Sequence, residues 1–97
     1  MRVAVGQREM TSMTHQETYA CPCCGYTTLD RPPTDTFQIC PVCFWEDDGV
    51  QYEDPDYKGG ANTVSLCQAQ HNFRTFGASD QESLPYVRRP TDEERPA

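Results

Sequence analysis

Two cysteine pairs constrain this sequence more than any other feature. Each pair has the form Cys-Pro-x-Cys, and the pairs are Cys21 with Cys24 and Cys40 with Cys43. Fifteen residues separate the pairs, which matches the C-x₂-C-x₁₅₋₂₀-C-x₂-C pattern of zinc sites. Two intervening residues let a tight loop direct both sulfur atoms at one ion, and the proline stiffens that loop. Four such thiolates suit a tetrahedral ion, so we predict one structural Zn²⁺ per chain.

The six cysteines of the chain also permit a disulfide framework. That alternative needs an oxidising compartment. The opening residues 1–19 contain no apolar run of the length a signal peptide requires, and no stretch approaches the length of a transmembrane span. We therefore expect a cytoplasmic protein with no membrane contact, in which the clustered cysteines remain reduced and bind metal.

The length and composition favour one small domain that a metal ion helps to stabilise. The chain has 97 residues, of which 36% are hydrophobic, so burial alone gives limited stability. We expect the domain to occupy residues 19–80. Residues 1–18 lack periodicity, and residues 81–97 carry three prolines among charged side chains. We expect disorder in the first segment, and disorder or loose docking on the core in the second.

The charge of the chain argues against nucleic acid as a partner. The formal net charge is −7, and nucleic-acid binding depends largely on Lys and Arg that neutralise phosphates. An acidic surface instead suits a protein partner with a basic surface. The sequence does not determine the oligomeric state.

The middle of the chain predicts a small α+β fold. Residues 26–29 and 37–39 have β-type composition and flank a turn at residues 30–35, which is rich in Pro and Asp. We expect a β-hairpin of the zinc-ribbon or rubredoxin type that carries the two Cys-Pro-x-Cys loops. Residues 46–60 are rich in Asp and Glu and are expected to form a solvated acidic loop.

One α-helix is predicted at about residues 65–76. Apolar side chains recur there at helical spacing and share one face; they are Leu66, Ala69, Phe73 and Phe76. Ser65 and Gln68 have the spacing of a capping box. Gly77 is suited to the left-handed conformation that follows a helix end.

Two further cysteines have less certain roles. Cys23 lies inside the first loop, adjacent to Cys24, and should point away from the ion as a free or redox-active thiol, or as a small packed side chain. Cys67 and His71 are four residues apart on the predicted helix and, with Cys23, offer a second metal site. The simpler alternative places Cys67 in the helix core and His71 in solvent.

A candidate binding surface follows the second cysteine pair and consists of Phe44, Trp45, Glu46, Asp47 and Asp48. Trp45 is expected to shield the metal site from water, with ligand stacking as the alternative. Phe44 occupies the position that Gly25 has in the first loop, and we expect it to adopt an ordinary turn conformation.

The sequence resembles the bacterial cysteine-rich CPCC family. The resemblance spans about 60 residues and rests on Cys-Pro-Cys-Cys-Gly-Tyr at 21–26, Ile-Cys-Pro-Val-Cys-Phe-Trp-Glu-Asp-Asp at 39–48 and Gly-Gly-Ala-Asn at 59–62. It continues through residues 65–66, 72–73 and 76–78. The family is a predicted zinc-binding domain without an established activity. The resemblance implies that Cys21, Cys24, Cys40 and Cys43 are ligands, and the loops themselves resemble those of rubredoxins and zinc ribbons.

Three functions remain open at this point. The first is a protein-binding module with a structural zinc ion, since four protein ligands leave no open position for catalysis at the metal. The second is rubredoxin-like electron transfer, because iron accepts the same four thiolates. The third is thiol-based redox sensing through Cys23. Catalysis is disfavoured because the chain has two histidines and no hydrolase motif.

Overall fold

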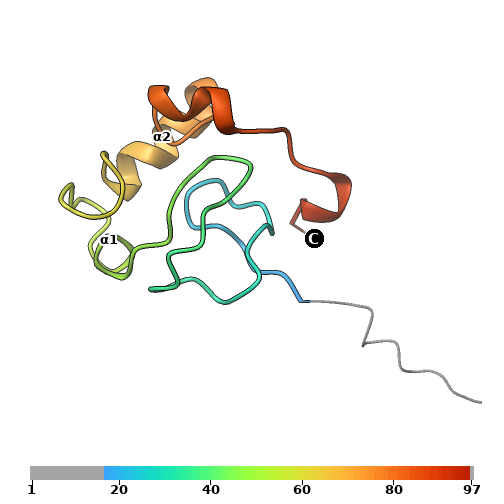
Figure 1. The fold of residues 1–97 in the computed structure, drawn as a ribbon, viewed down its shortest axis with the longest axis horizontal. Coiled ribbons are helices and arrows are strands. Elements are labelled where there is room, and N and C mark those ends of the chain that lie inside the picture. The colour runs from blue at the N-terminus through green and yellow to red at the C-terminus, as the bar shows by residue number, and fades with distance from the viewer. Residues whose placement is uncertain (1–16, 97) are drawn as a thin grey trace, which may run out of the picture.

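The computed structural model describes residues 17–96, in which irregular loops precede a helical part. Figure 1 shows the loops, coloured blue to green, with the helices arranged around them. The helical elements are α1 (Gly49–Glu53), α2 (Leu66–Phe76) and the 3₁₀ helices η2 (Gln81–Tyr86) and η3 (Asp92–Glu94). Within the described residues, no helix has the length and apolarity needed to cross a bilayer. The expectation for residues 1–18 falls almost wholly outside the described part.

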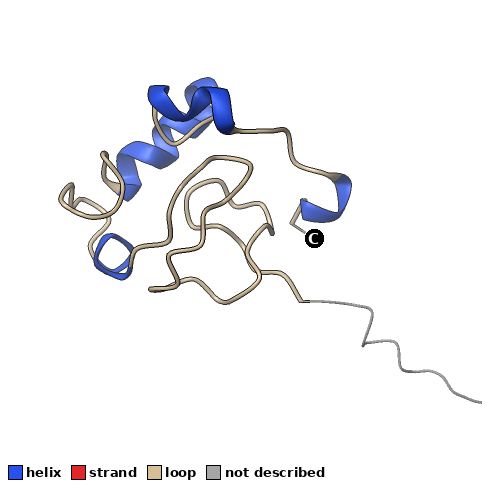
Figure 2. Ribbon diagram, in the orientation of Figure 1, coloured by secondary structure: helices blue, strands red, loops and turns tan. Residues whose placement is uncertain are grey.

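The hairpin expected from the sequence is not formed within residues 17–96, where Figure 2 shows helices and loops without strands. Two isolated antiparallel bridges join Tyr19 to Leu29 and Ile39 to Glu46. The two β-type segments therefore close separate loops instead of pairing with each other. The Pro-Pro turn lacks two backbone donors for a ladder, and Phe37 has a φ of 59°, which turns the chain out of the extended conformation.

Helix α2 forms where the sequence predicts it. The Ser65 hydroxyl accepts a hydrogen bond from the Gln68 amide at 3.1 Å, and Gly77 ends the helix with a φ of 92°. The reciprocal half of the capping box, in which the Gln68 side chain would accept from the Ser65 amide, is not formed; the Gln68 side chain donates through Nε2 to Asn72 Oδ1 at 2.8 Å. Leu66 and Ala69 are buried.

The core lies between helix α2 and the loops that carry the cysteines. Trp45 is its largest buried side chain, and Leu29, Val42 and the buried face of α2 belong to the same cluster. Phe73 of α2 meets the ring of Tyr26 edge to face, with 6.1 Å between the centroids. The small apolar core is thus built directly around the cysteine loops.

The segment expected to be a solvated acidic loop is partly helical and partly buried. Helix α1 begins after Asp48, whose carboxylate accepts from the amides of Val50 and Gln51. Its second oxygen accepts from the Ala61 amide at 2.8 Å. These three hydrogen bonds hold the pKa of Asp48 below its usual value despite its burial.

The C-terminal residues pack on the cysteine loops, although the sequence predicted disorder or loose docking. The Tyr86 ring stacks on Phe44 with 5.3 Å between centroids. Farther along, the carbonyl of Glu94 accepts from the Thr27 amide at 2.7 Å. Figure 1 shows the same arrangement, with the C-terminal end beside the early loops. Residues up to at least Glu94 therefore belong to the fold.

Candidate metal centre

The two Cys-Pro-x-Cys loops have the same backbone geometry. In the first loop the Gly25 amide donates to the carbonyl of Cys21, and the Cys21 amide donates to Tyr26. In the second loop the Phe44 amide donates to Cys40, and the Cys40 amide to Trp45. Donor and acceptor are four and five residues apart in both loops, so the local sequence duplication produces a structural duplication.

The fifth position of each loop has a left-handed backbone. The φ angles are 84° at Gly25 and 70° at Phe44. Glycine adopts this conformation without cost, whereas a side chain with a Cβ does not. The expectation of an ordinary turn conformation at Phe44 is therefore wrong: the loop geometry demands a positive φ whichever residue is present.

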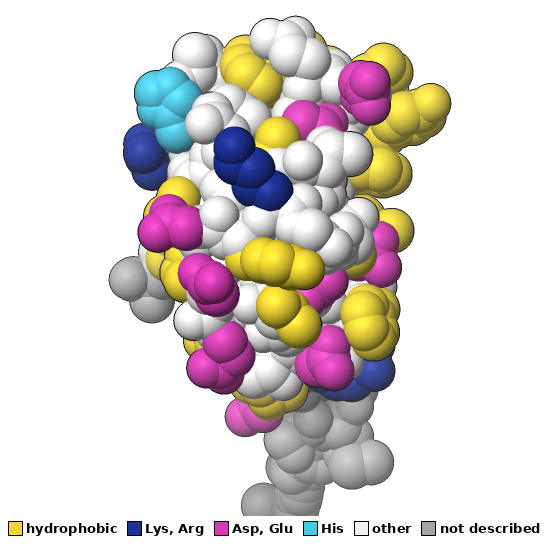
Figure 3. All heavy atoms as spheres, turned by 90° about the vertical axis from the view of Figure 1, so that its left-hand side faces the viewer, with side chains coloured by type: hydrophobic (Ala, Val, Ile, Leu, Met, Phe, Trp, Pro, Cys, Tyr) yellow, Lys and Arg dark blue, Asp and Glu magenta, His cyan; other side chains and the backbone are white. Residues whose placement is uncertain are grey.

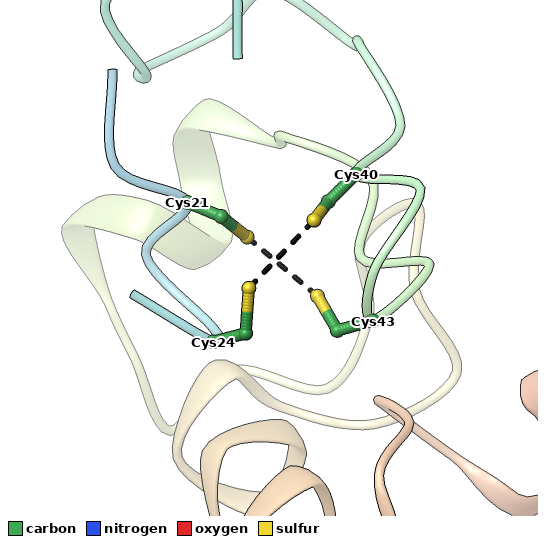
Figure 4. A group of neighbouring side chains, drawn as sticks. All are labelled: Cys21, Cys24, Cys40 and Cys43. Atoms are coloured by element: carbon green, nitrogen blue, oxygen red, sulfur yellow. Dashed lines mark hydrogen bonds between the residues drawn. The ribbon is translucent and has the colours of Figure 1, made fainter. Parts of the chain in front are cut away.

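The four cysteines of these loops converge on one point, as Figure 4 shows. Their sulfur atoms all lie within 4.8 Å of one another. The Sγ–Sγ distance is 3.6 Å for Cys21 and Cys43 and 3.7 Å for Cys24 and Cys40. A metal–sulfur bond of about 2.3 Å requires sulfur atoms roughly 3.8 Å apart at the corners of a tetrahedron. All six cysteines of the chain are free thiols. The donor set thus fits a tetrahedral metal ion and provides no support for a disulfide framework.

The electrostatics of the cluster call for a cation. Hydrogen bonds with Cys24 and Cys40 raise the pKa of the Cys21 thiol, and the hydrogen bond with Cys21 does the same for Cys43. The pKa of Cys40 is lowered because its neighbours donate to it. Without a positive charge, one thiolate is thus stabilised at the expense of the other thiols. A divalent ion removes this conflict, because it favours the deprotonated form of each ligand.

One hydroxyl group lies beside the cluster. Thr28 Oγ1 is 3.0 Å from Cys40 Sγ and can donate to the thiolate, which contributes to the lowered pKa of Cys40. Such outer contacts orient a ligand and adjust its charge. Thr28 lies in a segment that the sequence marked only as β-type, so no motif identified this role.

The later half of the chain fixes the position of both loops. Gln70 of α2 donates to the Pro22 carbonyl at 2.9 Å. The Arg88 amide donates to the Pro41 carbonyl at 3.1 Å, and the Ser79 amide to Cys43 at 2.8 Å. Each loop therefore receives at least one hydrogen bond from residues after 65. These contacts were not predictable from spacing, because they join distant parts of the chain.

The remaining cysteines and His71 lie outside the cluster. Cys23 belongs to the core and is 7% exposed, whereas Cys67 and His71 are both exposed. A hydrogen bond with Asp56 raises the pKa of Cys67, which favours the unreactive thiol. Within residues 17–96, the cluster of Cys21, Cys24, Cys40 and Cys43 is the one group that could hold a metal ion. The structure thus provides no second site at Cys67 and His71.

The candidate binding surface at residues 44–48 is largely inside the protein. Trp45 is 2% exposed, Asp47 1% and Asp48 8%. Asp47 Oδ2 accepts from the amide of Thr34 and from the amide and hydroxyl of Thr36. These three side chains therefore hold the fold together and cannot contact a partner. Phe44 and Glu46 are half-buried.

Comparison with known proteins gives one finding. The sequence model of the family described as Cysteine-rich CPCC matches residues 19–94. The matched segment includes both cysteine loops, α2 and the C-terminal residues that pack on the loops. A comparison with curated proteins gives no match.

Proposed function

Because the chain belongs to the cysteine-rich CPCC family, we propose that it is a small protein-binding module folded around one structural Zn²⁺ ion. The observation that carries this proposal is the convergence of four sulfur atoms within 4.8 Å of one another. Four protein ligands complete the coordination of zinc and leave no position for substrate or water. The ion then stabilises the fold, and function belongs to the surface.

The metal centre is of the zinc-ribbon or rubredoxin type at the level of its loops. The paired amide-to-carbonyl hydrogen bonds of the two loops support this assignment. The same four thiolates accept iron, so a rubredoxin-like electron carrier is the second candidate. The two candidates differ in colour, because oxidised iron–thiolate centres absorb visible light and zinc centres do not.

The surface that best suits a partner is formed by α1 and the loop after it. Val50, Tyr52 and Tyr57 are 58%, 39% and 43% exposed there. The exposed acids Glu53, Asp54 and Asp56 accompany them. Figure 3 shows this face, with acidic and apolar side chains intermixed. Aromatic groups among acids favour a partner that is basic and partly apolar, and free thiols fit a cytoplasmic location.

The test has a metal arm and a surface arm. We expect purified protein to hold one zinc ion and to unfold when a chelator removes it, with refolding on addition of zinc. For the surface, Tyr52→Ser/Tyr57→Ser should abolish the capture of a specific partner, whereas Phe37→Ser, on an exposed side chain in the Pro-Pro region, should not. Equal capture by both variants would contradict the assigned surface.

A further inference from the structure

The four ligand cysteines are unequally shielded from solvent. Cys21, Cys40 and Cys43 are 0–1% exposed, whereas Cys24 is half-buried. Cys24 borders an open pocket of ≈ 670 Å³. A ligand that replaces a cysteine at the metal must reach it from outside, so Cys24 is the most accessible position for such an exchange.

The lining of this pocket is basic and aromatic, although the whole chain is acidic. Tyr26 and Phe73 line it together with Arg74 and Arg95, and no Asp or Glu contributes to the lining. Four thiolates around a divalent ion carry a net charge of −2, which repels an approaching anion. The two guanidinium groups lower that repulsion and suit a small molecule with a carboxylate; Arg95 also lies 3.5 Å from Asp92 Oδ1 through its Nε.

A C-terminal strap, residues 87–96, spans the two cysteine loops beside this pocket. Near its start the Arg88 amide donates to Pro41 of the second loop, and near its end the Glu94 carbonyl accepts from Thr27 after the first loop. The side chains of Arg88 and Glu94 pair through two hydrogen bonds of 2.9 and 2.8 Å. This bidentate pair closes the strap on itself while its backbone holds both loops.

We propose that the pocket at Cys24 is the ligand-exchange site of the metal centre, that it takes anionic low-mass thiols, and that the strap controls its rate. The inference rests on the proposed metal site. In the exchange the incoming thiol binds the metal through sulfur and passes its proton to Cys24, which leaves as a neutral thiol. One metal–sulfur bond forms and one breaks, with no change of oxidation state.

The experiment follows zinc transfer from the loaded protein to a colorimetric chelator in the presence of a thiol. Mercaptoacetate should release zinc at least tenfold faster than cysteamine, a cationic thiol of similar size. Arg74→Gln/Arg95→Gln should remove that preference. Glu94→Gln and Arg88→Gln should each speed the release at least tenfold, whereas Glu93→Gln, which makes the same charge change one residue away, should leave it unchanged.

Two further readouts identify the site. Alkylation during release, mapped by mass spectrometry, should label Cys24 before the other three ligands. The Thr27 amide should exchange its hydrogen faster in Glu94→Gln than in Glu93→Gln. Labelling of another ligand first, or equal zinc release by Glu94→Gln and the wild type, would overturn this inference alone. A purified protein without metal would overturn the proposed function as well.

Discussion

Gly25 and Phe44 occupy equivalent positions in the two cysteine loops, and both have a positive φ. The amide of each residue donates to the carbonyl of the cysteine four residues earlier. Glycine adopts this geometry freely, whereas phenylalanine is strained in it. Its ring stacks on Tyr86, which offsets part of the strain and attaches η2 to the second loop.

This equivalence predicts an unusual order of stability at position 44. Phe44→Ala and Phe44→Gly both remove the stacked ring, but only glycine relieves the strain. We expect the glycine variant to be more stable than the alanine variant by about 1 kcal/mol. Gly25→Ala should lower the free energy of unfolding by a similar amount. An added Cβ at Gly25 would meet no atom within 4 Å, so the only cost is the backbone strain of a positive φ. Denaturant unfolding measures all three; an alanine variant at 44 that equals the glycine variant would refute the strain.

Asp47 should matter to stability far more than its place in an acidic stretch suggests. Asp47→Ala leaves three donors of Thr34 and Thr36 without their acceptor. We expect a loss of roughly 2–3 kcal/mol in the free energy of unfolding. Asp35→Ala is the matched comparison, because Asp35 is exposed and accepts one hydrogen bond, from the Gly49 amide. This variant should lose less than about 1 kcal/mol in the free energy of unfolding. Equal losses in the two variants would contradict the claim that the hydrogen bonds accepted by Asp47 stabilise the fold.

Thr28 should tune the affinity of the metal centre. Thr28→Val keeps the shape of the side chain and removes the hydroxyl that lies 3.0 Å from Cys40 Sγ. We expect zinc affinity to fall about tenfold, in the range typical of outer-shell contacts. Competition with a chelator of known affinity measures the change. Thr27→Val is the control, because the Thr27 hydroxyl donates to the Glu94 carbonyl and not to a ligand cysteine. Equal zinc affinity in the two variants would contradict the proposed role of Thr28.

The Arg88–Glu94 pair predicts a pH dependence in acid. Hydrogen bonds from Arg88 lower the pKa of Glu94 to about 2, below its ordinary value of 4.5. A carboxylate whose pKa is lower in the folded state stabilises the fold above its ordinary pKa. That contribution is then lost as the pH falls from 4.5 toward 2. The wild type should therefore exceed Glu94→Gln in stability by a constant amount above pH 5.5, and the difference should shrink below pH 4.5. The comparison covers the part of this range in which both proteins still hold the metal, with metal content measured at each pH; a difference that stays constant below pH 4.5 within that range would contradict the pair.

The parts of the fold that were predictable depend on local spacing. Two intervening residues define each cysteine loop, and the apolar positions of α2 with Ser65 and Gly77 define the helix and its ends. Nothing in the β-type segments themselves indicates which part of the chain each one pairs with. The expected pairing of residues 26–29 with residues 37–39 is therefore wrong. Phenylalanine as a residue type does not indicate a positive φ. The duplicated loop does indicate one, because Phe44 occupies the position that Gly25 has in the first loop.

The burial of the acidic stretch was not predictable because its partners are distant. Asp48 is satisfied in part by Ala61, thirteen residues away. The Asn62 side chain likewise pairs with the backbone of Glu46 in both directions. The composition of such a segment predicts that it is solvated, whereas the fold supplies its hydrogen bonds from residues in the neighbouring loops, which are Thr34, Thr36, Ala61 and Asn62. The same reason applies to the C-terminal strap, whose contacts lie on the cysteine loops.

The most direct test of this account is the metal content of the untagged protein, purified without added metal, with its visible spectrum. We predict one zinc ion per chain, no colour and two thiols that bind no metal, Cys23 and Cys67, which are counted after denaturation. Cys40→Ser should lose both the metal and the cooperative unfolding transition, whereas Cys67→Ser should retain both. One iron per chain with thiolate charge-transfer bands would instead establish the electron carrier. A chain without metal, or a Cys40→Ser variant that stays folded without it, would contradict the central claim.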